Sequence, residues 1–103
     1  MPETERQQIL STLATLESEI RALGVETLSL FGSAMRDEMH TDSDIDILVR
    51  FRLGEKNFSR FLELSELLEH HLGRRVELIT TEALSPFFGP HILSEALDVI
   101  RAA

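Results

Sequence analysis

Residues 32–49 read GSAMRDEMHTDSDIDILV and place two acidic side chains inside what is otherwise a β-strand. Aliphatic residues separate Asp44 from Asp46 and follow them, in the alternation typical of a strand. Because side chains two apart on a strand share a face, both carboxylates project from one side. Neighbouring carboxylates repel each other unless a cation lies between them. The stretch therefore predicts a strand that begins with a cation-binding pair.

A divalent metal ion is the simplest cation for this pair. Mg²⁺ prefers oxygen ligands and usually binds through one or two carboxylates together with substrate phosphates. A further carboxylate, Glu77, lies in the β-rich stretch VELIT of residues 76–80. If that strand lies beside the first, Glu77 would complete the metal shell or act as general base for an acceptor hydroxyl. Asp44, Asp46 and Glu77 are therefore the predicted metal ligands and catalytic residues.

The turn before the acidic strand has the features of a phosphate-binding site. Gly32 lets the backbone approach an anion closely, and the Ser33 hydroxyl can donate a hydrogen bond to it. A helix beginning here would direct free N–H groups at the same anion, and Arg36 adds a forked cationic group. Each motif alone is weak, since an Asp-x-Asp pair is often a solvated strand face, but the combination favours a Mg-nucleotide site.

The rest of the chain predicts a small α/β (α+β) domain, a three-stranded sheet with flanking helices in the order α-β-(α)-β-α-β-α. Apolar spacing indicates helices over residues 4–23, 57–72 and 92–100, with a short helix over 34–38. Strands are expected over residues 25–31, 44–51 and 76–80. The second long helix is expected to bury Phe58, Phe61, Leu62, Leu68 and Leu72. The length of 103 residues predicts a single domain over residues 1–103.

Charge and composition limit the classes of partner. Eighteen acidic against ten basic residues give a net charge of −8, which opposes direct contact with nucleic-acid phosphates or an anionic membrane. The absence of cysteine excludes disulfides and thiolate sites and is typical of a reducing compartment. The polar start MPETERQQIL does not resemble a signal peptide, and no apolar run approaches the length of a membrane span. We expect a cytoplasmic protein, with homo-oligomer formation left open.

At these residues the sequence resembles the nucleotidyltransferase superfamily that includes DNA polymerase β, and in particular its minimal nucleotidyltransferase branch. The signature of that family is Gly-Ser, ten residues, then Asp-x-Asp, which here is Gly32-Ser33 and Asp44 to Asp46. The resemblance implies a polymerase β-like core and Mg²⁺-dependent transfer of a nucleoside monophosphate, AMP from ATP, to a hydroxyl with release of pyrophosphate. It also implies that Glu77 occupies the third carboxylate position of the family.

Minimal nucleotidyltransferases are commonly antitoxins paired with a HEPN-domain ribonuclease toxin. The resemblance therefore implies AMP transfer to a tyrosine hydroxyl of such a partner. An alternative is an antitoxin that neutralises its partner by stoichiometric binding alone, and a third hypothesis takes a small-molecule hydroxyl as acceptor. Residues 92–100 and the pair Phe87-Phe88 are candidates for partner contact, with core packing as the alternative that the helix favours. Arg74 and Arg75 are candidates for contact with phosphate or the partner, or belong to a solvated turn.

Overall fold

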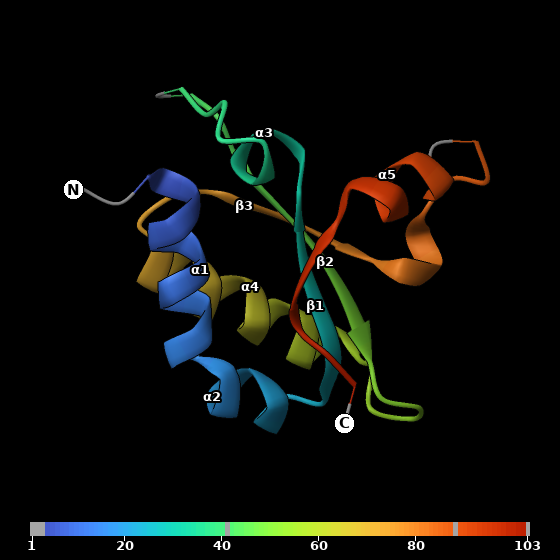
Figure 1. The fold of residues 1–103 in the computed structure, drawn as a ribbon. Coiled ribbons are helices and arrows are strands. Elements are labelled where there is room, and N and C mark those ends of the chain that lie inside the picture. Colours follow the sequence, from blue (N-terminus) through green and yellow to red (C-terminus); the bar gives the residue numbers. More distant parts are fainter. Residues whose placement is uncertain (1–3, 41, 88, 103) are drawn as a thin grey trace.

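The computed structural model describes residues 4–40, 42–87 and 89–102 and forms a four-stranded sheet with its long helices gathered on one side (Figure 1). The helices are α1 (Glu5–Thr15), α2 (Glu17–Ala22), α3 (Gly32–Met35), α4 (Phe58–Leu72) and α5 (Gly89–Glu95), and a 3₁₀ turn spans Thr81–Ala83. The strands are β1 (Val25–Phe31), β2 (Ile45–Phe51), β3 (Val76–Thr80) and β4 (Leu97–Ile100). Among the described residues, no helix has the length and apolar character to cross a bilayer.

The sheet is mixed, with β2 at the junction between its two kinds of pairing. The spatial order is β3-β2-β1-β4. β2 runs antiparallel to β1 and parallel to β3, while β4 runs antiparallel to β1. Parallel neighbours need a crossover connection, and α4 supplies it between β2 and β3. The start of β2 therefore lies beside the start of β3 and the end of β1.

The hydrophobic core lies between the sheet and helices α1, α2 and α4. Its fully buried members include Leu13, Ile20, Leu28, Leu30, Ile45, Ile47, Val49, Leu64 and Leu68. Because Ile45 and Ile47 point into this core, the alternation of β2 directs Asp46 to the opposite face. Asp46 thus lies on the face opposite the main core, beside the buried side chains of Phe31 and Leu48.

The predicted helix over residues 92–100 is wrong in its second half. α5 ends at Glu95, and the following residues form β4, which adds a fourth strand to the three that were expected. The apolar residues fit a helical period locally, but the strand buries Ile100 and pairs with the backbone edge of β1. The hydroxyl of Ser29 also donates to the Asp98 carboxylate over 2.7 Å. Long-range pairing has overridden the local pattern.

The first helix is also divided where the sequence predicts continuity. Thr4 and Gln7 form the expected capping box, but the helix breaks at Leu16 and resumes as α2. The N–H of Leu16 donates to the carbonyl of Leu13 over 3.1 Å, a tighter turn than an α-helix makes. Both leucines remain buried, so the break lets two short helices follow the twisted sheet.

α4 follows the predicted bounds and buries part of the predicted set, because Leu68 is fully buried and Phe61 and Leu72 are partly buried against the core. Asn57 caps its start as expected, and Leu68 is buried together with Leu64. Phe58 and Leu62, which were predicted to face the core, are 78% and 44% exposed. Phe58 and Leu62 are exposed because α4 packs on the core through a different face, which carries Leu64 and Leu68.

Candidate active site

The parallel pairing of β2 with β3 brings together two of the predicted site residues. Asp46 is the register partner of Glu77 on β3 and of Phe31 on β1. Register partners project from the same face of a sheet. Asp46 and Glu77 therefore lie side by side on the face opposite the helix-packed core. The expectation that the strand of Glu77 lies next to the strand of Asp46 is confirmed.

The pKa of Asp46 shows the cost of this arrangement. Partial burial, a hydrogen bond to Glu77 and the negative charges of Glu77 and Asp44 together raise it from its ordinary value of 3.8 to about 6, with burial the largest cause. The positive charge of Arg36 opposes this effect. Asp46 therefore keeps its proton up to about pH 6, and its carboxyl group is hydrogen-bonded to Glu77. A metal ion could take the place of that proton.

Asp44 lies just before β2 and has a different partner. Its Oδ1 is 3.9 Å from Nε of Arg75, the residue just before β3. Within residues 4–40, 42–87 and 89–102, no three acidic or imidazole side chains converge into a ready-made metal cage. The structure therefore brings Asp46 and Glu77 into direct contact, while Asp44 acts on them through its charge.

The structure requires glycine at position 32 for a reason that the sequence alone does not show. Its φ is +71°, in the region that favours glycine, and a Cβ at this position would overlap Oδ2 of Asp46. The missing side chain makes room for the carboxylate as well as for an approaching anion. Ser33 follows in α3, and its carbonyl accepts a hydrogen bond from the N–H of Glu38 over 2.8 Å, which closes the turn after the helix.

Arg36 lies at the end of α3 between the acidic pair and α5. Its Nη1 is 3.3 Å from Oε2 of Glu95, and its Nε is 3.3 Å from Oε2 of Glu38. Its charge also lowers the pKa of Asp46, so the guanidinium is within electrostatic reach of the carboxylates. Sequence reasoning found Arg36 but missed Glu95, because 59 residues separate the two positions and no motif links them.

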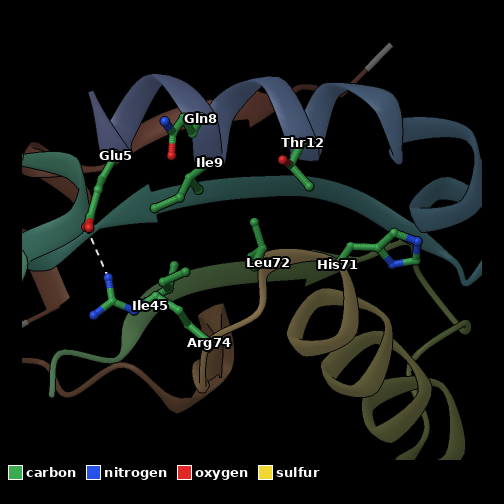
Figure 2. Close-up of a pocket in the computed structure, with 8 residues that line it drawn as sticks. All are labelled: Glu5, Gln8, Ile9, Thr12, Ile45, His71, Leu72 and Arg74. Atoms are coloured by element: carbon green, nitrogen blue, oxygen red, sulfur yellow. Dashed lines mark hydrogen bonds and ion pairs between the residues drawn. The ribbon is translucent and has the colours of Figure 1, made fainter. Parts of the chain in front are cut away.

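Two hollows lie near the start of β2, and they differ in content. The pocket in Figure 2 measures about 180 Å³ and lies between α1 and the end of α4, on the core side of Ile45. Figure 2 shows Arg74 directed toward Glu5, and Nη1 of Arg74 is 3.0 Å from that carboxylate. The second hollow, of about 430 Å³, is polar and is lined by Asp42, Ser43, Asp44, Gly73, Arg74 and Arg75. The second is the larger of the two, has the size of a ligand site and adjoins Asp44.

The candidates for partner contact lie near the C-terminal end of the described chain. Phe87 is 87% exposed, and Leu93 and Leu97 are 56% and 40% exposed. Phe88 lies outside the described residues. These exposures favour the surface interpretation of Phe87 over core packing, whereas Ile100 in the same segment is buried.

A mixed sheet with a glycine turn before β2 and a carboxylate pair across β2 and β3 defines the polymerase β-like class of nucleotidyltransferases. The family described as Polymerase beta, Nucleotidyltransferase matches residues 7–101. The chain belongs to this family, and the predicted fold class is confirmed apart from the number of strands.

Known proteins resemble the chain over most of its length. The protein adenylyltransferase MntA of Thermococcus cleftensis is 37% identical over 90% of this chain and 94% of its own. A solved minimal nucleotidyltransferase superposes with a TM-score of 0.71 and 32% identity, over 85% of this chain and 93% of that one. A chain from the complex of tri-AMPylated Shewanella oneidensis HEPN toxin with MNT antitoxin superposes with a TM-score of 0.66 over 94% of this chain and 73% of that one. At 18% identity this last match shows the fold alone.

The contact between Gly32 and Asp46 predicts unequal effects of alanine at two glycines. Gly73 also has a positive φ, of +67°, but a Cβ there would meet nothing within 4 Å. Gly73→Ala should therefore lower the free energy of unfolding by about 1 kcal/mol through backbone strain alone. Gly32→Ala should cost at least about 1 kcal/mol more, because its methyl group displaces the carboxylate. Urea unfolding compares the two, and equal losses would contradict the contact.

The raised pKa of Asp46 predicts a stability term that depends on pH. Its pKa is higher in the folded chain than in the unfolded one, so the folded state binds the proton more tightly. This contribution is complete below about pH 4 and is lost as the pH rises through about 6. Wild type should therefore lose unfolding free energy relative to Asp46→Asn between pH 4 and 7. Urea midpoints of both proteins test this, and a pH-independent difference would refute it.

Proposed function

We propose that this chain is a Mg²⁺-dependent protein adenylyltransferase that acts as an antitoxin. It transfers AMP from ATP to a tyrosine hydroxyl of a partner HEPN ribonuclease toxin and releases pyrophosphate, and residues 1–103 form a single minimal nucleotidyltransferase domain. The observation that carries the proposal is the contact of Asp46 with Glu77 beside the Gly32 turn.

The donor set suits magnesium. Mg²⁺ is usually held by one or two carboxylates together with substrate phosphates, so the Asp46–Glu77 pair needs no closed protein cage around it. The charge of Arg36 only partly offsets the carboxylates, since the pKa of Asp46 is still raised to about 6, and a divalent cation would supply the remaining positive charge. Asp44 would join the pair as a further ligand. When bound, the metal would neutralise the phosphates and make the acceptor hydroxyl easier to deprotonate.

The residues of the chain have separate roles in the proposed transfer. Arg36 and the Ser33 hydroxyl bind oxygens of the triphosphate, and Gly32 keeps the approach open. The acceptor oxygen then forms a bond to the α-phosphorus, and the bond from that phosphorus to the bridging oxygen breaks. Pyrophosphate leaves with the bonding electron pair, and the hydroxyl proton passes to Glu77 as general base.

The relatives support the kind of acceptor. The Thermococcus relative is named a protein adenylyltransferase, and the Shewanella complex joins an MNT antitoxin to an AMPylated HEPN toxin. Exposed Phe87 and Leu93 offer an apolar contact for such a partner. The proposal places this reaction in the cytoplasm, where ATP is supplied.

Intact-mass spectrometry tests the proposed transfer. The purified HEPN partner, incubated with this protein, ATP and Mg²⁺, should gain mass in units of AMP, and peptide mapping should place the adduct on tyrosine. The combined substitution Asp44→Ala and Asp46→Ala, or removal of the metal by a chelator, should reduce transfer to background. The combined substitution Glu63→Ala and Glu66→Ala is the matched control, because these two exposed acids lie on α4, away from the acidic strand and from the polar hollow.

The same experiment separates catalysis from simple binding. If the partner gains no mass but forms a stable complex in which its ribonuclease activity is blocked, the protein is a stoichiometric antitoxin. If the double variant retains full transfer, the assignment of the carboxylates is wrong.

A further inference from the structure

We propose that Arg75 is an exchangeable counter-ion of Asp44 that binds the nucleotide phosphates once a metal ion takes its place. The inference rests on the proposed function and adds a second phosphate-binding cation to the site. Its position before β3 gives it no place in the Gly-Ser and Asp-x-Asp signature.

The sheet places Arg75 beside the acidic pair by the same register that forms that pair. The N–H of Ile45 donates to the carbonyl of Arg75 over 2.9 Å, and Ile45 is the register partner of Val76. Asp44 and Arg75 are therefore neighbours at the starts of two parallel strands. Alternation puts Arg75 on the same face as Glu77, two residues later. Along these two strands, Asp44 and Arg75 therefore lie side by side just before Asp46 and Glu77.

The contact between Arg75 and Asp44 is easily exchanged. The atoms are 3.9 Å apart, the Arg75 side chain is 78% exposed and that of Asp44 is 37% exposed. An exposed pair with this geometry contributes little to folding, so breaking it costs little. A divalent cation on Asp44 would repel the guanidinium and compete for the same carboxylate oxygen. Metal binding to Asp44 therefore weakens its contact with Arg75.

Once released from Asp44, the guanidinium of Arg75 can bind an anion in the adjoining hollow. Arg75 lines the polar hollow of about 430 Å³ that adjoins Asp44. Its neighbour Arg74 also lines this hollow, but its Nη1 is 3.0 Å from Glu5 (Figure 2). Nη2 of Arg74 donates to the carbonyl of His40 over 2.6 Å. The fork of an arginine matches two oxygens of a phosphate, which gives Arg75 the chemistry to bind a triphosphate.

The negative net charge of the chain makes a second cation at the site favourable for nucleotide binding. With a net charge of −8, the protein repels a nucleotide triphosphate unless positive groups lie at the site. Arg36 follows β1 on one side of β2, and Arg75 precedes β3 on the other side. The two guanidinium groups therefore flank the strand that carries Asp46.

Calorimetric titration of Arg75→Ala with two probes tests this inference. Mg²⁺ with the non-hydrolysable analogue AMP-PNP should bind about tenfold more weakly than to wild type, because a charged hydrogen bond to phosphate is lost. Mn²⁺ alone should bind about two- to fivefold more tightly, because its competitor on Asp44 is gone. A merely structural role for Arg75 would not move the two affinities in opposite directions.

Two further variants control for charge and geometry. Arg50→Ala removes the same charge from the opposite end of β2, where Arg50 pairs with Glu26 over 2.6 Å. This variant should leave both affinities unchanged. Arg75→Lys keeps the charge without the fork and should recover part of the AMP-PNP affinity. Unchanged AMP-PNP binding by Arg75→Ala, or no AMP-PNP binding by wild type, would overturn the inference. Wild type that binds AMP-PNP but transfers no AMP would overturn only the proposed function.

Discussion

The parallel pairing of β2 with β3 holds the carboxyl groups of Asp46 and Glu77 together, and the site depends on the electrostatic cost of that contact. The cost appears as the raised pKa of Asp46, which retains a proton to about pH 6. The absence of a side chain at Gly32 leaves room for the Asp46 carboxylate, and Arg36 offsets part of the negative charge. The other face of the same strands compensates, because Ile45 and Ile47 are fully buried against the helices. Such a division, with stability on one face and strain on the other, is typical of a functional site.

Much of the fold and of the site could be predicted because local patterns and tertiary structure agree there. The alternation of residues 44–51 determines both the strand and the face of Asp46, and it holds because Ile45, Ile47 and Val49 need a core. Asn57 caps α4 where the sequence predicts, since that interaction lies within three residues. Glu77 was expected beside the aspartates only if the third strand lay next to the second, and the α4 crossover makes these two strands parallel neighbours.

The remaining features depend on contacts between residues far apart in the sequence. Residues 97–100 form a strand because the edge of β1 is open to pairing, which a helical period over nine residues cannot reveal. The exposure of Phe58 and Leu62 is set by the angle at which α4 meets the sheet. The pairs formed by Arg36 with Glu95 and by Arg75 with Asp44 join elements that no motif connects. The predicted three-carboxylate set is only partly assembled, because Asp44 pairs with Arg75 while Asp46 contacts Glu77.

The central claim is that the Asp46–Glu77 pair is the metal-binding part of a nucleotide site. The most direct test is a crystal structure of the protein with Mn²⁺ and AMP-PNP, in which anomalous scattering locates the metal. The account predicts a manganese peak at coordination distance from carboxylate oxygens of Asp46 and Glu77, with the triphosphate on the side of Gly32 and Arg36. A nucleotide bound in the pocket of Figure 2, or manganese away from both carboxylates, would contradict it.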